Sequence, residues 1–299
     1  MTTFVDGPVQ VSVPATSANL GPGYDSLGLA LSLRDELEAE VLPEGLVVQV
    51  EGEGSDGVPT DESHLVVRAM RAAFTQMGAQ PPGLRLTCKN SVPHARGLGS
   101  SSAAIVGGVV LARALVAGGS LLMDDEAAFR LTAELEGHPD NVAPAFYGGF
   151  VISGADEDGF FAVGSSVDPR VSAVVFIPAE GVETKVARGL LPERVPHRDA
   201  AADAGRAALL VAALAGRPEQ LLRATQDYLH QQYRRPAMPA SLDLVDRLRA
   251  AGVPAVVSGA GPTVLAFCDD SQAAALETRC PRGWRSLHLD VDPSGARLE

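Results

Sequence analysis

The chain has 299 residues, 46% of them apolar, and a formal net charge of −13. A chain of this length buries about three quarters of its unfolded surface, which is enough for one large domain or two ordinary ones. The negative charge argues against an extended surface for nucleic acid or an anionic membrane, although a local anion site needs only a few donors.

Targeting signals are absent by the usual patterns. The sequence holds no run of about 18 apolar residues, and residues 1–8 lack a basic segment followed by an apolar one, so we expect neither a membrane span nor a signal peptide. The three cysteines lie far apart in the sequence and form no CxxC pair. This pattern favours reduced thiols and a cytoplasmic protein.

In the first half of the chain, alternating runs and turn residues predict strands mixed with helices. Strands are predicted at 9–13, 35–41, 46–50, 84–87 and 146–153. Helices are predicted at 64–77, 103–116 and 124–136, the last with acidic residues in its first turn. Residues 52–59 are a glycine-rich turn, and the acidic, glycine-rich residues 154–159 indicate a hairpin or a linker.

The second half predicts a mixed α+β domain with the order β-α-α-α-β-β-α-β. Its strands are predicted at 171–177, 255–257, 263–267 and 285–289, and its helices at 200–214, 218–229, 242–250 and 272–278. Because the composition changes near residues 155–170, we predict two domains, 1–160 and 161–299.

A loop rich in glycine and serine joins the strand at 84–87 to the helix after it. We name this segment the phosphate loop; it comprises Pro93, His94, Ala95, Arg96, Gly97, Leu98, Gly99, Ser100, Ser101, Ser102 and Ala103. Its glycines permit positive φ and close approach of a ligand to the backbone, and its serines are predicted at the N-cap and first turn of the helix. Free N–H groups, the helix dipole and hydroxyls suit a polyphosphate. Neither a Walker A nor a dinucleotide-binding pattern is present, and the alternative is an ordinary glycine-rich loop with a serine cap.

Three further segments accompany the phosphate loop: PATSANLGPGYD at 14–25, EGHPDNVAP at 136–144 and SGAGPT at 258–263. Together they resemble the motifs of the GHMP small-molecule kinases, and the first two are most similar to the homoserine kinases of that family. The similarity extends to Thr184-Lys185-x-x-Arg188 and Gln232-Tyr233-Arg234, so it spans residues 11–267.

The resemblance implies a two-domain α+β fold. It comprises an N-terminal ribosomal-protein-S5-like α/β domain that holds ATP and a C-terminal ferredoxin-like domain, with the active site between them. It also implies a homodimer, and transfer of phosphate from ATP to the side-chain hydroxyl of L-homoserine on the route to threonine.

The implied reaction requires that the protein hold the phosphates, hold Mg²⁺ and place the hydroxyl in line with the γ-phosphorus. Mg²⁺ prefers hard oxygen ligands and keeps several waters. By resemblance these ligands are Ser101 and Glu136, with Glu134 as the alternative carboxylate. A solvated helix face is the other interpretation of either glutamate.

The resemblance implies substrate contacts from Asn19, Asp25, His138, Asn141, Arg188 and Arg234. An aspartate suits an ammonium group, and the paired donors of arginine suit a carboxylate. Asx turns and surface ion pairs are the alternative interpretations of these side chains.

The predicted catalytic residues are Asn141, Arg234 and Glu136. An amide does not accept a proton at neutral pH, so we expect catalysis by positioning and charge stabilisation, with the proton passing to phosphate or solvent. Asp140 is the alternative base. The competing functions are another kinase of the family, acting on mevalonate, a sugar or a nucleotide precursor, and a binding protein without turnover.

Overall fold

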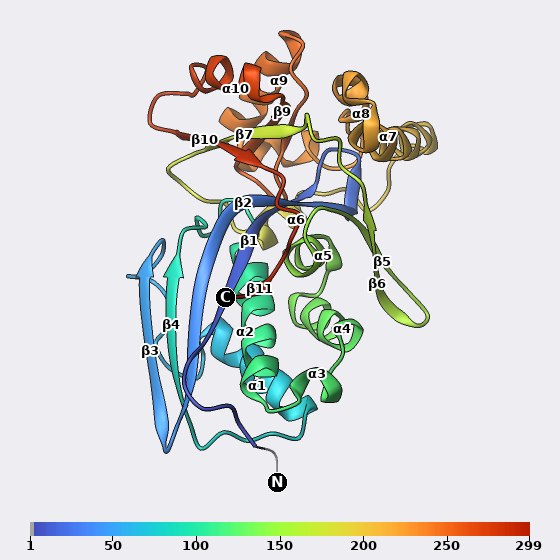
Figure 1. Ribbon diagram of the computed structural model, residues 1–299. Coiled ribbons are helices and arrows are strands. Elements are labelled where there is room, and N and C mark those ends of the chain that lie inside the picture. Colours follow the sequence, from blue (N-terminus) through green and yellow to red (C-terminus); the bar gives the residue numbers. More distant parts are fainter. Residues whose placement is uncertain (1–2) are drawn as a thin grey trace.

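The structure is a computed structural model that describes residues 3–299, and it contains two β-sheets, one in each part of the molecule (Figure 1). The first sheet has seven strands, in the order β11-β1-β2-β4-β3, with β5 paired to β2 and β6 paired to β5. Its strands are β1 (Val9–Asn19), β2 (Gly23–Leu42), β3 (Gly45–Gly52), β4 (Gly83–Asn90), β5 (Phe150–Asp156), β6 (Gly159–Ser165) and β11 (Arg297–Leu298). All its pairs are antiparallel except β3 with β4.

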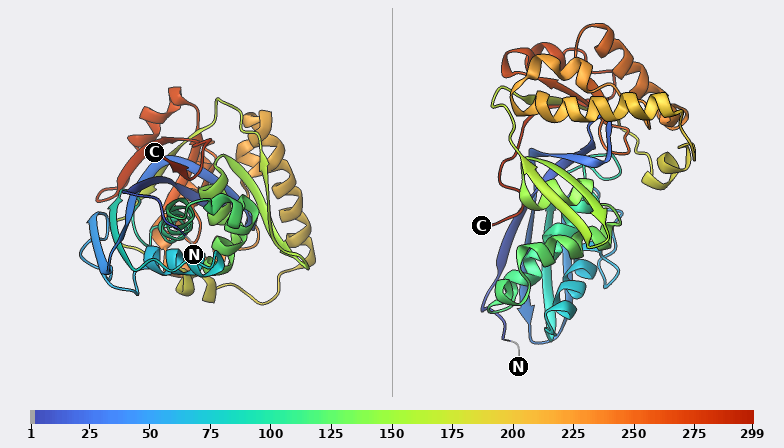
Figure 2. Two further views of the ribbon diagram at one scale, coloured as in Figure 1. Left: turned by 60° about the horizontal axis from the view of Figure 1, so that its bottom comes forward. Right: turned by 90° about the vertical axis from the view of Figure 1, so that its right-hand side faces the viewer.

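Helices cover one face of this sheet (Figures 1 and 2). They are α1 (Leu65–Gln76), α2 (Ser100–Leu115), α3 (Gly119–Leu122), α4 (Asp125–Glu136) and α5 (Pro139–Tyr147). The central helix α2 is rich in small residues, which lets its neighbours approach closely. A Cβ on Gly108 would lie only 2.6 Å from the carbonyl oxygen of Val66 in α1. The buried helix α2 therefore fixes the phosphate loop from which it starts.

The second sheet has four antiparallel strands in the order β10-β7-β9-β8. They are β7 (Ser172–Ile177), β8 (Ala255–Val257), β9 (Val264–Cys268) and β10 (Arg285–Asp290). Their chain order and pairing are those of a ferredoxin-like sheet. The helical elements of this part are α6 (Thr184–Gly189), α7 (His197–Gly216), η1 (Pro218–Gln220), α8 (Leu221–Ala224), η2 (Gln232–Ala237), α9 (Pro239–Ala250) and α10 (Asp270–Glu277).

Alternating side chains of β7 join two hydrophobic cores. Val174 and Phe176 pack with α9 and α10, whereas Val175 belongs to a core that also contains Leu29 and Phe150 of the first sheet. The two parts of the molecule thus share a continuous apolar core, and burial of that core holds them in a fixed relation.

Most predicted elements are confirmed, and the differences have local causes. The strand predicted at 9–13 continues to Asn19, and residues 23–42 form one long strand with register shifts in its pairing to β1. Helix α5 was not predicted and includes the first residues of the strand predicted at 146–153; Pro139 occupies its first turn, where a missing N–H has no cost. Residues 225–229, predicted helical, are irregular.

The start of α2 also differs from the prediction. Its N-cap is Gly99, with φ of 72° and no side-chain cap, so the three serines occupy the first helical turn. Residues 154–159 form a hairpin within the first sheet, as one of the two alternatives had it, because β5 pairs with β6. The chain enters the second sheet after Ser165 and returns with β11, while the domain bounds 1–160 and 161–299 stay a prediction.

Two predictions about the whole chain can be compared with the described residues. Within residues 3–299, no helix is both long and apolar enough to cross a bilayer. Cys88, Cys268 and Cys280 are all free thiols, as their spacing predicted.

Candidate active site

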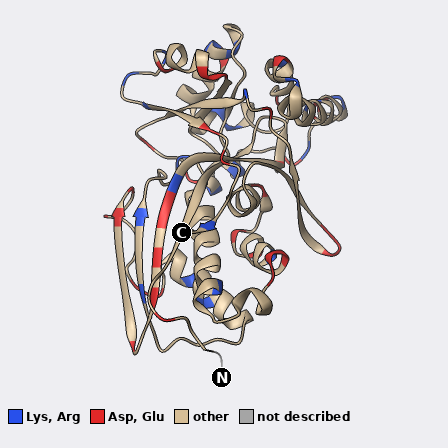
Figure 3. Cartoon of the chain, in the orientation of Figure 1, with Lys and Arg blue, Asp and Glu red and all other residues tan. Residues whose placement is uncertain are grey.

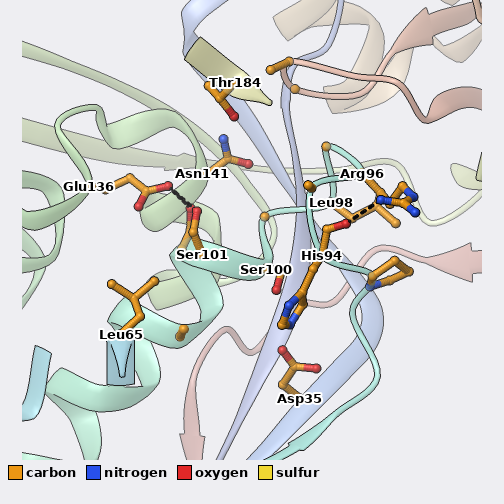
Figure 4. A pocket seen from close by; sticks show the side chains of 18 of the residues that line it. Asp35, Leu65, His94, Arg96, Leu98, Ser100, Ser101, Glu136, Asn141 and Thr184 are labelled. Carbon is orange, nitrogen blue, oxygen red and sulfur yellow. Dashed lines mark hydrogen bonds between the residues drawn. The ribbon is translucent and has the colours of Figure 1, made fainter. Parts of the chain in front are cut away.

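A cavity of about 430 Å³ brings the sequence motifs together, and its size is typical of small-molecule sites. Its lining residues come from the segments 58–66, 88–104, 136–141 and 259–260, and from Asn19, Asp35, Leu37, Thr184, Arg188 and Arg234. Figure 4 shows Ser101, Glu136 and Asn141 on one side of this cavity and His94 and Arg96 on the other. Both halves of the chain contribute to the cavity.

The phosphate loop is held by the last motif. Gly97 has φ of 76°, and a Cβ there would lie 2.3 Å from the carbonyl oxygen of Ser258. The hydroxyl of Ser258 in turn donates to the carbonyl oxygen of Gly97 at 2.6 Å. Only glycine permits this contact, so the segment 258–263 supports the shape of the loop.

The guanidinium of Arg96 bonds to backbone carbonyl oxygens, which leaves it poorly placed to bind a phosphate. It donates to the carbonyl oxygens of His94 at 2.9 Å and Pro178 at 3.1 Å, and to that of Ala179. These bonds tie the phosphate loop to the segment that follows β7. The contribution of Arg96 to an anion site is therefore its backbone rather than its side chain.

One carboxylate faces the serines of the phosphate loop. The hydroxyls of Ser101 and Ser102 both donate to Oε1 of Glu136, at 2.9 and 2.7 Å (Figure 4 shows the bond from Ser101). The alternative carboxylate, Glu134, is exposed on α4. Hydroxyl and carboxylate oxygens are hard donors, so Ser101 and Glu136 fit a Mg²⁺ ion.

Asn19 connects two motifs. Its Oδ1 accepts from the backbone N–H of Asp25 and its Nδ2 donates to the carbonyl oxygen of Gly259, both at 2.9 Å. The side chain is 4% exposed and its backbone has φ of 67°. The bond from Asp25 spans six residues, so it is not the two-residue Asx turn that we considered as an alternative, and the bond to Gly259 ties the first motif to the second half of the chain.

Asp25 and Arg188 form an ion pair at the cavity. The guanidinium of Arg188 donates to both carboxylate oxygens of Asp25, at 2.7 and 3.2 Å, and to the hydroxyl of Tyr24 at 3.1 Å. About a third of each charged side chain is exposed, so water and a small ligand can reach the pair. The predicted binders of opposite charges on a substrate thus contact each other.

Arg234, in η2, is 1% exposed. Its Nη1 donates to the carbonyl oxygen of Gly259 and to Nδ1 of His230, both at 3.1 Å, while its Nε has no partner among the described residues. His230 contacts the carbonyl oxygen of Gly21 through Nε2 at 2.8 Å, so Nδ1 is its acceptor. Burial lowers the pKa of Arg234, which means that its charge is incompletely stabilised. A carboxylate ligand in the cavity would supply what is missing.

His138 and Asn141 lie at the start of α5. Nδ1 of His138 is 2.9 Å from Oδ1 of Asp140, whose side chain is buried. Burial opposes protonation of His138, but the hydrogen bond and charge of Asp140 raise its pKa overall. Oδ1 of Asn141 accepts from the hydroxyl of Thr16 at 2.9 Å, so its Nδ2 is left to donate. Thr16 was missed by sequence reasoning, although it lies inside the first motif.

Sequence reasoning also missed the residues at the end of the cavity opposite the charged side chains described above. Val58, Pro59 and Leu65 form apolar walls there, and Nδ1 of the buried His64 has no partner among the residues that the structure describes. Oδ1 of Asp35 accepts from the backbone N–H groups of residues 91 and 92, at 2.6 and 2.8 Å, and burial raises the pKa of Asp35 to about 6. No local pattern indicates that these residues face a ligand.

The cavity therefore combines a helix N-terminus for phosphates with buried groups of both charges, which defines a small-molecule kinase. Residues 64–149 match the GHMP kinases N terminal domain, and residues 209–285 match the GHMP kinases C terminal domain. The chain belongs to the GHMP kinase family, and the expected fold is confirmed.

Individual relatives give a more specific comparison than the family models do. The chain is 54% identical to a homoserine kinase of Streptomyces avermitilis over 290 residues, which cover 97% of this chain and 95% of that protein. Its fold matches the crystal structure of homoserine kinase from Cytophaga hutchinsonii with a TM-score of 0.85 at 27% identity, covering 98% and 97% of the two chains. It also matches a putative homoserine kinase from Listeria monocytogenes with a TM-score of 0.78 at 33% identity, covering 97% and 99%.

Proposed function

We infer that the chain is a homoserine kinase, which transfers the γ-phosphoryl group of ATP to the side-chain hydroxyl of L-homoserine. The observation that carries this conclusion is that Arg188 and Arg234 line the same cavity as the phosphate loop, with Asp25 held next to it by its ion pair with Arg188. An amino acid presents an ammonium group and a carboxylate together. Mevalonate and sugars lack the ammonium group and would leave the carboxylate of Asp25 without a ligand partner.

The nucleotide binds, in this proposal, along the phosphate loop. The N–H groups at the start of α2 face the polyphosphate, where the helix dipole favours negative charge. Ser101 and Glu136 would hold Mg²⁺, whose chemistry there is to neutralise charge on the phosphate oxygens. The base occupies the end of the cavity between Val58, Pro59 and Leu65, where Nδ1 of His64 supplies a hydrogen-bonding partner.

The amino-acid substrate binds at the opposite end. Its carboxylate contacts the free N–H of Arg234 and the guanidinium of Arg188, and its ammonium group contacts Asp25. Arg188 and Asp25 already neutralise each other, so the substrate replaces one internal ion pair by pairs with itself. This exchange favours ligands that carry both charges, because a ligand with one charge leaves an unpaired group behind.

Asn141 and His138 orient the reacting hydroxyl. The bond from Thr16 fixes the amide of Asn141, so that its Nδ2 donates toward the cavity. The hydrogen bond and charge of Asp140 raise the pKa of His138, which favours the protonated imidazole as a hydrogen-bond donor toward the substrate. The hydroxyl oxygen bonds to the γ-phosphorus as the bond from phosphorus to the β,γ-bridging oxygen breaks. The hydroxyl proton passes to a phosphate oxygen or water, and Asp140 acts through His138 as a positioning residue.

The test is a coupled ADP-release assay with ATP and Mg²⁺. L-homoserine, L-threonine, L-serine, mevalonate and galactose serve as separate acceptors. We expect turnover with L-homoserine well above the other four, and its loss in Asn141→Ala. Turnover with mevalonate or galactose in place of homoserine would overturn the substrate assignment, and no turnover with any acceptor would leave a binding protein.

A further inference from the structure

His230 is a fully buried histidine that joins the first motif to Arg234. It lies in the irregular segment 225–231, between α8 and η2. Its Nε2 is 2.8 Å from the carbonyl oxygen of Gly21, and its Nδ1 is 3.1 Å from Nη1 of Arg234. The imidazole thus bridges a turn near the start of the chain and the guanidinium that receives the substrate carboxylate in the proposed function.

The two partners of His230 determine its protonation state. A carbonyl oxygen only accepts a hydrogen bond, so Nε2 carries the proton, and a guanidinium only donates, so Nδ1 offers its lone pair. Only the neutral tautomer with a proton on Nε2 satisfies both partners. Burial favours this form because it lowers the pKa of His230, and the charge of Arg234 acts in the same direction. The carboxylates of Asp227 and Asp25 act against it but do not reverse the shift.

The backbone around His230 is fixed before any ligand binds. The carboxylate of Asp227 accepts the backbone N–H groups of residues 229–231 at 2.7 to 3.2 Å, which stabilises the turn that carries the imidazole. The turn at Gly21 approaches this segment so closely that a Cβ on Gly21 would lie 2.6 Å from the carbonyl oxygen of Thr225. The imidazole therefore offers Nδ1 at a defined place.

Arg234 depends on this acceptor for its orientation. Its Nη1 has two N–H groups, of which one bonds to His230 and the other to the carbonyl oxygen of Gly259 at 3.1 Å. Its Nε has no partner in the part of the chain that the structure describes. The guanidinium carbon lies 5.6 Å from the centre of the Tyr24 ring. Without Nδ1, Nη1 would keep a single acceptor, about which the guanidinium is free to turn.

The charge of the whole protein makes this orientation important. The net charge is −13, and Figure 3 shows acidic residues in both parts of the molecule. The overall field therefore repels a substrate carboxylate, whose binding depends on Arg188 and Arg234 at the cavity. Arg188 is already paired with Asp25. A guanidinium of Arg234 that is oriented in advance lowers the cost of binding.

We propose that His230 is a positioning residue for the amino-acid substrate, and that its Nδ1 holds Arg234 in the orientation that receives the carboxylate. This inference rests on the proposed function. Because Nε2 bonds to Gly21, in the same motif as Asp25, His230 also sets the spacing between the groups that bind the two charges of the substrate. Loss of Nδ1 should weaken binding of the amino acid and leave binding of ATP unchanged.

Two substitutions separate the two bonds of the imidazole. The short side chain in His230→Asn places its amide near the position of Nδ1, so an acceptor for Arg234 remains and the bond to Gly21 is lost. The longer side chain in His230→Gln reaches the position of Nε2, so the bond to Gly21 remains and the acceptor is lost. We expect His230→Gln to raise the KM for L-homoserine at least about 10-fold, and His230→Asn by less than about threefold, because the bond to a charged group is the stronger one. The KM for ATP should change by less than about twofold in both variants, and kcat less than the KM for L-homoserine.

Steady-state kinetics and thermal melts on the full chain make this comparison, with the parent protein measured first. Both variants lose one buried hydrogen bond and should lose similar stability, so a difference between their KM values does not come from unfolding. His197→Gln, the same change at an exposed histidine, is the matched control and should leave both KM values unchanged. A parent protein without turnover of L-homoserine would refute the proposed function itself. In an active parent protein, equal rises in the two His230 variants, or no rise in His230→Gln, would overturn only the positioning role.

A second measurement needs no substitution of His230. Nitrogen-15 NMR of histidine-labelled protein at pH 7.5 reports which ring nitrogens carry a proton. We expect a neutral imidazole, protonated on Nε2, whose Nδ1 resonance shifts between the parent protein and Arg234→Met. If no such imidazole shifts its Nδ1 resonance, Nδ1 of His230 does not hold Arg234 and the inference is wrong.

Discussion

The two ends of the cavity are built in different ways. The phosphate side is largely one continuous segment, the phosphate loop, whose glycines and serines present backbone groups and short hydroxyls to the cavity. The opposite end is assembled from charged side chains far apart in the chain: Asp25, His138, Arg188 and Arg234. Phosphates need many donors of fixed geometry, which a helix start provides locally. A zwitterion needs separated charges of both signs, which only distant elements can bring together.

Each end of the cavity also contains a buried ionisable side chain, and the two side chains differ in how well the protein satisfies their hydrogen-bonding groups. The carboxylate of Asp35 accepts two backbone N–H bonds from the two residues between β4 and the phosphate loop. The guanidinium of Arg234 has an N–H without a partner in the described part of the chain, and no carboxylate lies within salt-bridge distance. Asp35 thus has a structural use in the free protein, whereas Arg234 would gain its missing partner from the substrate in the function we propose.

The largest effect should follow from removing Arg234. We expect Arg234→Met to lower kcat/KM for L-homoserine about 10³-fold, because loss of one partner of a buried charge pair costs about 4 kcal/mol. The KM for ATP should change little. Thermal stability should not fall, since burial already disfavours this charge.

Steady-state kinetics and a thermal melt measure both effects. The matched control is Arg235→Met, because Arg235 pairs with Asp243 and Asp246 on the surface and should be dispensable for activity. A fall in stability without a change in kcat/KM would make Arg234 a structural residue and would remove the contrast with Asp35.

Asp35 provides the reciprocal test at the other end. Its pKa is raised from 3.8 to about 6, so folding favours the neutral carboxyl. The stability that the neutral form contributes is present below pH 3.8 and is lost as the pH rises through about 6. Asp35→Asn keeps an oxygen acceptor for both N–H groups and carries no charge. We expect it to raise the free energy of unfolding at pH 7 by at most about 3 kcal/mol, with no gain near pH 3.5.

Urea denaturation of Asp35→Asn and the parent protein at pH 3.5 and 7 measures this difference. A gain of equal size at both values would show that it comes from packing and not from titration of the carboxyl.

Substitutions of Glu136 and Glu134 can distinguish a metal site from a solvated helix face. Glu136→Gln should lower kcat about 10²-fold and raise the Mg²⁺ concentration needed for half-maximal rate, because the amide is a weaker ligand for a hard cation. Glu134→Gln is the matched control on the same helix and should leave both quantities unchanged. Equal effects of the two substitutions would argue for a general loss of negative charge.

The smallest effect is expected at the base end. His64→Leu removes one hydrogen-bonding group and fills the same space, so we expect the KM for ATP to rise about fivefold. The KM for L-homoserine should stay the same. If the KM values for ATP and L-homoserine rise together, His64 supports the cavity as a whole and does not contact the nucleotide specifically.

The local sequence determined the elements whose chemistry lies within a few residues. The helices α1 and α4, the strands of the second sheet and the family were predicted correctly, because turn residues, periodicity and motif spacing act over short distances. The choice between Glu136 and Glu134 was left open, since both lie on one helix and only packing against α2 brings Glu136 to Ser101.

The placements of side chains that depend on long-range contacts became known only from the tertiary structure. It turned the guanidinium of Arg96 toward backbone carbonyls, brought Thr16 against Asn141 and set His64 and Asp35 at the base end of the cavity. It also left one N–H of Arg234 unpaired and placed His230 between Arg234 and Gly21. A sequence pattern reports which residues are adjacent along the chain, whereas burial and pairing depend on which elements the hydrophobic core packs together.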